Sequence, residues 1–336
     1  MPLPLDTATV DLAKNVLGSL KDLAGGPHPG IRPAHAKGLL VTGRFVPTPA
    51  AAALSRAPHL TSPDGTPVIV RFSSSTGHPS LPDTDPNGNP RGIALRFVLA
   101  ETPRRKHTDI VAHSVPFFPA ATPAETAAFF RAVKNAGTDL DTLNAHISAH
   151  PAAQAFLAAP KPTPVSFAHE AFYAVNAFKF INAEGKETYV RYRIVPVAGL
   201  ATLDEEAAKA KPAEFLYDGV RQQLAGSAGK ASPIQYRLVV QVARDGDVTD
   251  DNTVHWPEEG PDARELVDLG LVTLDALFED KNEDKGESST KSDADEQKYL
   301  IFDPIPRVDG IEASADPLLE MRAAVYLISG KERRAA

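Results

Sequence analysis

The sequence predicts an α+β fold in which a large antiparallel sheet or barrel carries helical additions. Apolar and polar residues alternate in 93–99, 190–194 and 236–242, and such alternation is typical of half-buried strands. Apolar residues recur at helical spacing in 5–23 and again after Asp316. Strands this far apart in the chain, with helices between them, indicate one large sheet with helical additions.

Three segments have the ends expected of helices. The segment 5–23 stops at a Gly-Gly pair, a common helix exit. The segment 122–136 has Pro123 near its start, where a missing N–H costs little. In the last segment Asp316 can cap the helix and Pro317 fits its first position. We expect helices at both ends of the chain and one between the strands.

Two segments are predicted to be loops. Residues 79–90 are rich in Pro, Asp, Asn and Gly. Residues 279–297 are highly charged, Ser-rich and without apolar periodicity, which favours a solvated, mobile loop. No internal repeat interrupts the chain, and we expect residues 1–336 to form a single domain.

Composition excludes several classes of protein. The net charge of −8 and the lack of a basic tract argue against nucleic acid or an anionic membrane as partner. Cysteine is absent, so any metal must be held by oxygen or nitrogen. The N-terminus lacks a signal-peptide pattern, and no run of eighteen apolar residues occurs. A cytoplasmic location is the expectation.

Arg322 and Tyr326 are four residues apart, so they share one face of the C-terminal helix. A guanidinium beside a phenol favours the phenolate, the form that a ferric iron prefers as ligand. Taken alone, the pair favours a core tyrosine next to a surface charge. The residues in front of it decide between the two.

Residues 308–326 resemble a segment of the catalase superfamily. The run from Val308 to Asp316 is similar to P-G-I-E-P-S-P-D, and Arg322 and Tyr326 follow in the register of R-x-x-x-Y. In catalases this tyrosine is the proximal haem ligand. The resemblance therefore implies a catalase-like antiparallel β-barrel core, haem b (iron) as cofactor, and Tyr326 as the iron ligand.

A second set of motifs matches the distal side of the family. Residues 32–38 are similar to R-x-x-H-A-K-G, whose histidine, here His35, lies over the iron. Residues 71–73 match R-F-S, whose serine, here Ser73, fixes the ring of that histidine. Further matches, in the order of the family, lie at 91–92, 182–185, 251–257 and 269–272.

The resemblance also implies positive partners for the anionic haem propionates. Arg32 and Arg71 match family positions with this role, as does Arg333, seven residues beyond Tyr326. The planar fork of arginine suits this role because it can engage a carboxylate through two hydrogen bonds. Arg322 is expected to hold Tyr326 as the anion.

The chain departs from the family above the haem. Catalases place an asparagine there, in D-L-V-G-N-N-T-P, and the ungapped counterpart at 109–116 puts His113 at that position and Ser114 next to it. A neutral imidazole donates one proton where an amide donates two. His113 is therefore expected either to contact a bound peroxide or to point into the scaffold.

The chain is identified as a member of the small catalase-related peroxidases, because it lacks the long N-terminal arm and the C-terminal helical region of full-length catalases. We expect His35 to act as distal base, and peroxidase activity with a small organic reductant to exceed weak catalase activity. Three alternatives stay open: a fatty-acid hydroperoxide rearranging enzyme, a non-catalytic haem carrier or sensor, and a barrel for apolar ligands without haem. The sequence does not fix the oligomeric state, with a homodimer or a homotetramer as candidates.

Overall fold

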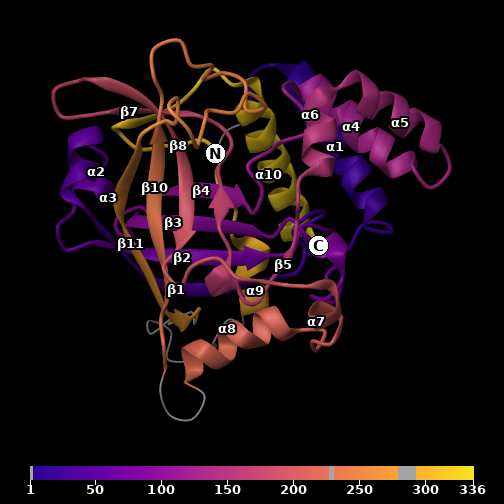
Figure 1. Ribbon diagram of the computed structural model, residues 1–336, viewed down its shortest axis with the longest axis horizontal. Coiled ribbons are helices and arrows are strands. Elements are labelled where there is room, and N and C mark those ends of the chain that lie inside the picture. The colour runs from indigo at the N-terminus through magenta and orange to yellow at the C-terminus, as the bar shows by residue number, and fades with distance from the viewer. Residues whose placement is uncertain (1–2, 227–230, 279–292) are drawn as a thin grey trace.

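The computed structural model describes residues 3–226, 231–278 and 293–336. Its centre is a closed antiparallel β-barrel, with a large group of helices on one side and further helices below it and on the opposite side (Figure 1). Pairing of β8 with β10 closes the sheet into a ring, and the barrel strands are β10 (Ile234–Val242), β11 (Leu266–Leu277), β1 (Gly38–Pro47), β2 (Thr66–Ser73), β3 (Gly92–Ala100), β4 (Lys106–His113), β6 (Phe172–Tyr173) and β8 (Glu187–Pro196). The predicted α+β fold with a barrel core is confirmed.

Two short strands extend the sheet beyond β8, namely β7 (Phe178–Ile181) and β12 (Ile311–Ala313). A separate pair is formed by β5 (Thr163–Pro164) and β9 (Thr202–Leu203). The described α-helices are α1 (Thr7–Leu23), α2 (Pro49–Leu54), α3 (Pro58–Thr61), α4 (Pro123–Asn135), α5 (Leu140–Ala149), α6 (Pro151–Ala158), α7 (Glu205–Lys209), α8 (Phe215–Ala225), α9 (Asp293–Tyr299) and α10 (Pro317–Ala335). None of them is long and apolar enough to cross a membrane.

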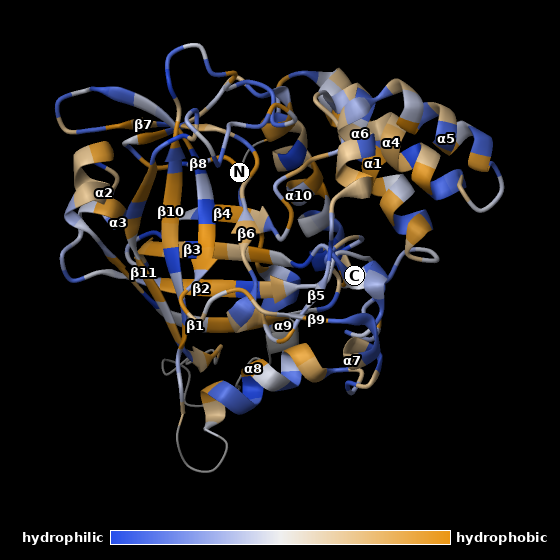
Figure 2. Ribbon diagram, in the orientation of Figure 1, coloured by the Kyte–Doolittle hydropathy of each residue, from blue (hydrophilic) through white to orange (hydrophobic). Residues whose placement is uncertain are grey.

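The alternating residues of the strands fill the barrel, as the sequence predicts. Val190, Tyr192 and Ile194 of β8 are buried in the same cluster as Tyr236 and Leu238 of β10. Figure 2 shows the matching bands of hydrophobic residues along the barrel strands. The chain thus withdraws its apolar strand faces from water inside the barrel.

A second apolar cluster lies outside the barrel, among α1, α4 and α10. It contains Val16, Ala127, Leu318, Met321 and Ala324. The termini of these helices agree with prediction: Asp316 accepts a hydrogen bond from Leu318 N at 2.9 Å, and Pro317 opens α10. This cluster holds α10 at a fixed place beside the end of the barrel.

One predicted loop needs correction. Residues 279–292 lie outside the described part of the chain, but the remainder of the segment 279–297 belongs to α9. Gln297 accepts a hydrogen bond from Arg71 Nε at 2.7 Å and donates one to the Gly38 carbonyl at 3.1 Å. These contacts, which composition cannot reveal, hold Gln297 of α9 against β1 and β2. The predicted loop at 79–90 contains only the 3₁₀ turn Pro86–Gly88 as regular structure.

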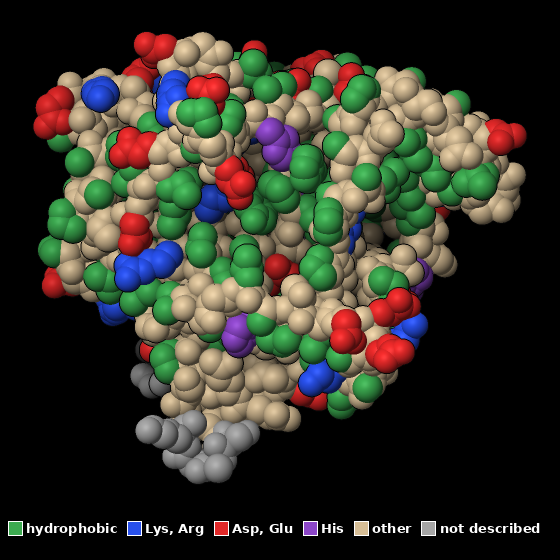
Figure 3. Space-filling view, viewed as in Figure 1, with side chains coloured by type: hydrophobic (Ala, Val, Ile, Leu, Met, Phe, Trp, Pro, Cys, Tyr) green, Lys and Arg blue, Asp and Glu red, His purple; other side chains and the backbone are tan. Residues whose placement is uncertain are grey.

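Charge is spread over the visible surface without a dominant sign. Figure 3 shows acidic and basic side chains interspersed on the face that it draws. Ionisable groups inside the protein are the more informative ones, and among them are three histidines. Burial lowers the pKa of His35 and of His59 to about 3, and that of His113 to about 4.

His59 of α3 can be used to measure how much stability a buried neutral histidine costs the folded chain at low pH. It is 1% exposed, and the centroid of its ring lies 4.3 Å from that of the Phe97 ring. Its Nδ1 has no hydrogen-bond partner among the described residues. Below pH 6.5 the unfolded chain binds a proton at this residue and the folded chain does not, so acid favours unfolding. Each such histidine removes about 1.4 kcal/mol of stability per pH unit.

We therefore predict that His59→Phe flattens the pH dependence of the free energy of unfolding. Between pH 6 and pH 4 the wild type should lose about 1.4 kcal/mol per pH unit more than the variant. Urea unfolding at several pH values measures the difference directly, with all other titrating groups shared by the two proteins. Equal slopes would show that His59 is protonated in the folded chain.

Candidate functional site

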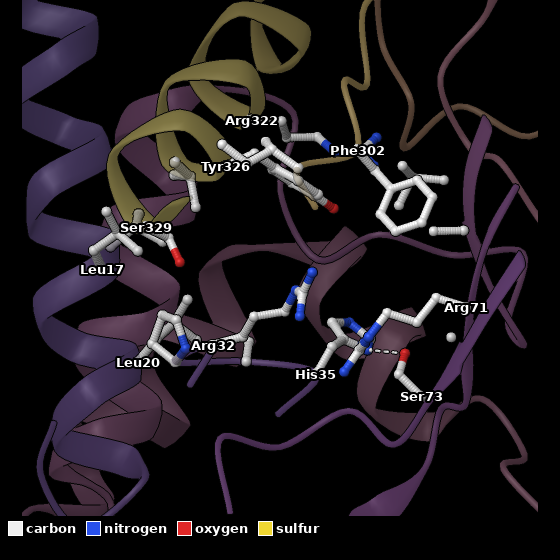
Figure 4. Close-up of a pocket in the computed structure, with 18 of the residues that line it drawn as sticks. Leu17, Leu20, Arg32, His35, Arg71, Ser73, Phe302, Arg322, Tyr326 and Ser329 are labelled. Carbon is white, nitrogen blue, oxygen red and sulfur yellow. Dashed lines mark hydrogen bonds between the residues drawn. The ribbon is translucent and has the colours of Figure 1, made fainter. Parts of the chain in front are cut away.

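A cavity of about 200 Å³ separates the end of the barrel from the helical cluster. Its walls come from the barrel, from α1, α4 and α10, and from the segment after α9 (Figure 4). A smaller chamber of about 100 Å³ adjoins it, and both spaces are bordered by His35, Phe118, Arg322 and Tyr326. The two spaces together form the candidate site.

The barrel contributes one row of residues that lie side by side across neighbouring strands. Ser73 at the end of β2 is opposite Gly92 of β3, and Gly92 is opposite His113 at the end of β4. His113 is in turn opposite Tyr173 of β6. Residues from four strands, 100 positions apart in sequence, thus meet at one rim of the barrel.

His35 lies immediately before β1 and faces this rim. Its backbone has φ 54°, a left-handed conformation that costs energy for a non-glycine residue and is often kept at functional sites. His35 N donates to the Ser75 carbonyl at 3.1 Å, and ring Nδ1 is 3.0 Å from Ser73 Oγ. Burial, and then the charges of Arg71 and Arg32 among others, keep its pKa at about 3. The ring is therefore neutral at physiological pH.

Gly92 provides the space for this pair. A Cβ atom at position 92 would lie 2.6 Å from Ser73 Oγ and 2.8 Å from His35 Nδ1. Both distances are far below van der Waals contact, so any side chain here must displace the histidine, the serine or both. The glycine is required by the close approach of the ring.

The opposite wall is α10, from which Arg322 and Tyr326 face the cavity (Figure 4). Arg322 Nη1 donates to Asn176 Oδ1, and Asn176 Nδ2 donates to Asp316 Oδ2 at 2.7 Å. Asn252 Nδ2 donates to the same carboxylate oxygen at 3.2 Å. The residue that caps α10 therefore also holds, through Asn176, the arginine one turn before Tyr326.

Arginines gather at a third side of the cavity. Arg32 Nη2 and Arg333 Nη2 both donate to the Leu300 carbonyl, at 2.8 and 3.1 Å. Arg71 Nη2 donates to the Ala36 carbonyl at 3.1 Å. Burial lowers the pKa of Arg333 to about 10, still well above neutrality. The cluster offers concentrated positive charge to an anion in the cavity.

These groups fit the haem that the sequence resemblance implies. Arg333 Nε is buried and has no hydrogen-bond partner among the described residues, which leaves a donor for a carboxylate. The walls between the polar groups are apolar, with Leu17 and Leu20 from α1, Val325 from α10 and Phe302. A planar apolar group with two acidic arms would match this distribution.

The structure brings most of the predicted residues together. The larger cavity is bordered by His35, Ser73, Arg32, Arg71, Arg322, Arg333 and Tyr326, while His113 borders the smaller chamber. Ser114 is used in the scaffold, because its Oγ accepts from Arg91 N at 2.9 Å and its own N donates to the Arg91 carbonyl at 2.8 Å.

Three residues of the site were missed in the sequence. Asn176, Tyr173 and Gln297 belong to no motif noted above. Asn176 and Gln297 act through hydrogen bonds to partners 146 and 226 positions away. Tyr173 lies in the two-residue strand β6, which is too short to leave a recognisable pattern in the sequence.

We predict that Gly92→Ala breaks the His35–Ser73 contact while the barrel stays folded. The added methyl group must push the imidazole away, whereas the strand pairing of residue 92 uses only its backbone. The ring ¹⁵N and ¹³C shifts of His35 should change, and those of His59 should not. Gly219→Ala is the matched control, since nothing lies within 4 Å of a Cβ there. Unchanged His35 shifts would contradict the crowding argument.

Comparison with known proteins agrees with this geometry. The model of the family described as "Catalase" matches residues 30–335. The chain is 32% identical over 314 residues to a "Catalase-related peroxidase" of Mycolicibacterium paratuberculosis, covering 92% of this chain and 91% of the relative. It is 31% identical to a protein of the same name from Synechococcus elongatus, covering 92% of this chain and 85% of that one.

Longer relatives are matched only in part. A "Catalase" of Pseudomonas syringae is 27% identical, and the match covers 88% of this chain but 56% of the relative. A solved structure described as "Structure of a bacterial catalase" superimposes with a TM-score of 0.73 at 22% identity, over 99% of this chain and 62% of that one. The family match over nearly the whole chain, with the two relatives above 30% identity, shows that the chain belongs to the catalase family and is an oxidoreductase acting on peroxide.

Proposed function

We propose that the protein is a haem peroxidase that reduces hydrogen peroxide or organic hydroperoxides with an organic electron donor and has weak catalase activity. The observation that carries the proposal is the pair of facing walls, with the His35–Ser73 pair on one side and Arg322 and Tyr326 on the other. A haem carrier or sensor has no need of a buried, neutral base above the iron.

Different residues of the cavity are proposed to hold the iron and the propionates of haem b. Tyr326 is the proposed iron ligand, and Arg322, held by Asn176, places a positive charge on the same wall. Arg32, Arg71 and Arg333 are the proposed partners of the propionates. When bound, the haem supplies the iron that binds peroxide and exchanges electrons with peroxide and donor.

His35 is the proposed acid–base group. Ser73 engages Nδ1, so Nε2 is the ring atom left to take a proton from one peroxide oxygen and deliver it to the other. A pKa of about 3 keeps the ring ready to accept that proton at any physiological pH. Ser73 acts by orienting the ring, since its hydroxyl fixes the position of Nδ1.

Two features support a peroxidase with weak catalase activity. His113 stands where the family's asparagine is expected, so a second hydrogen peroxide loses the amide that would position it. The cavity is apolar toward α1 and α4, which suits an organic molecule. The two relatives above 30% identity carry the name catalase-related peroxidase, in line with this assignment.

The same apolar wall also suits a lipid hydroperoxide as substrate, which the protein would rearrange instead of reducing.

For the assembly we propose a homodimer or a homotetramer. The whole chain, residues 1–336, is proposed to act as one haem-binding unit.

The proposed function is tested by the absorption spectrum of the purified protein before and after addition of hemin. We expect a Soret band with a high-spin ferric pattern, lost or strongly shifted in Tyr326→Phe because the phenolate ligand is gone. Tyr189→Phe on β8, which does not border the cavity, is the control and should match the wild type. No Soret band after hemin addition would contradict haem binding itself.

The same preparation identifies the reaction. Oxidation of a dye donor should outrun oxygen release from hydrogen peroxide by about tenfold or more, roughly 1.4 kcal/mol in activation free energy. Faster oxygen release would make the protein a catalase instead. Isomerised products from a fatty-acid hydroperoxide, formed without donor, would favour the rearranging enzyme.

Gln297 gives a separate test of the propionate assignment. Gln297→Glu places a carboxylate where Arg71 Nε now donates to an amide oxygen, so it should compete with a propionate for that guanidinium. We expect hemin to bind about tenfold more weakly, the order of one charged hydrogen bond. Hemin dimethyl ester, which lacks the acidic arms, should bind the variant and the wild type alike. Equal loss with both ligands would mean that α9 merely fails to pack.

A further inference from the structure

His113 is one of the polar residues that border the small chamber. Its ring borders this space together with His35, Tyr173, Arg322 and Tyr326. Nε2 lies 2.9 Å from the Phe117 carbonyl oxygen, four residues along the chain. A carbonyl oxygen can only accept, so the proton of the neutral ring must be on Nε2 and is used within the scaffold.

The other ring nitrogen is then an acceptor. In the tautomer with hydrogen on Nε2, Nδ1 carries a lone pair and cannot donate. Nδ1 forms no hydrogen bond with any residue that the structure describes, and the ring is open to the chamber. Burial, the largest effect, lowers the pKa of His113; the Phe117 carbonyl opposes it with a smaller effect, and the nearby Arg322 lowers the pKa further. The chamber therefore presents a fixed acceptor at this position.

Hydrogen peroxide and alkyl hydroperoxides differ at the oxygen that would donate a hydrogen bond to such an acceptor. Hydrogen peroxide carries a hydrogen on each oxygen, so one can go to His35 and the other can be donated to His113. An alkyl hydroperoxide carries one hydrogen, and its second oxygen bears carbon. A buried acceptor left facing carbon loses its hydrogen bond without compensation, and sites of this kind discriminate strongly against the analogue that lacks the hydroxyl.

We propose that His113 Nδ1 accepts a hydrogen bond from the outer O–H of the peroxide and so selects hydrogen peroxide over alkyl hydroperoxides. This inference rests on the proposed function, since it concerns the substrate of the same site. It narrows that function to one peroxide class. It also gives His113 a narrower role than that of the family's asparagine, because an amide can donate a hydrogen bond as well as accept one.

The tautomer is measured first, without turnover. ¹⁵N NMR of the full chain, alone and with the diamagnetic zinc protoporphyrin IX, should show a protonated Nε2 and an unprotonated Nδ1 at His113 from pH 8 to pH 5. A proton on Nδ1 in this range would overturn the inference, because the chamber would then receive a donor. His59→Phe serves to assign one of the two other buried histidines and should leave the His113 signals unchanged.

Selectivity is measured next, on the haem-loaded protein with hydrogen peroxide and tert-butyl hydroperoxide. In His113→Phe, which keeps a ring and removes the acceptor, the rate constant for hydrogen peroxide should fall about three- to tenfold, the worth of one neutral hydrogen bond. The rate constant for tert-butyl hydroperoxide should stay the same or rise. In His113→Asn the amide can also donate, so the ratio of the two rate constants should move toward one.

The outcomes separate this inference from the proposed function. Equal slowing of both peroxides in His113→Phe, or no change in either, would overturn the selectivity while leaving the peroxidase intact. A wild-type protein that reacts with neither peroxide contradicts the proposed function and this inference with it. His59→Phe is again the control, because it removes a buried imidazole that does not border the chamber.

Discussion

The candidate site depends on the register of the antiparallel barrel. Ser73, Gly92 and His113 come from three strands, and only the observed pairing of β2, β3 and β4 places them in one row. A slip by one residue would turn the side chains of a strand to the opposite face of the sheet. The irregularity of β3 with β4 lies between Val98 and Ala100, at the far end of the strands, so the row itself stays regular.

The second wall is formed by α10, and its position is set by the hydrogen bonds at the start of that helix. Asp316 caps the helix and accepts hydrogen bonds from Asn176 and Asn252, so the start of the helix is tied to the connections that follow β6 and β10. From that point the helical repeat determines where Arg322 and Tyr326 face. The packing of α10 against α1 then maintains the width of the cavity, because Val16 and Met321 belong to one buried cluster. Barrel register and helix start together place the two walls opposite each other.

The sequence predicted the barrel, the terminal helices and eight polar or charged residues that border the two spaces, because each of these leaves a local pattern or a motif. It did not predict Asn176 or Gln297, since their roles arise from partners far away in the chain. The composition of 279–297 indicated solvent exposure, yet one amide in it contacts Arg71 and Gly38. For His113 the residue type was visible, but the direction of its hydrogen bond depends on where the Phe117 carbonyl points.

Positive charge and a neutral base coexist in this cavity, and each supports the other. Arg71 and Arg32, proposed to bind acidic arms of the cofactor, also lower the pKa of His35, after the larger effect of burial. Protonation of His35 would add another cation to a buried cluster that includes Arg333, whose own pKa is already lowered by desolvation. The electrostatics that attract an anionic cofactor therefore add to burial in keeping His35 unprotonated. A substitution that neutralised this cluster would weaken the anion site and would raise the pKa of His35 toward its usual value, while the larger effect of burial would remain.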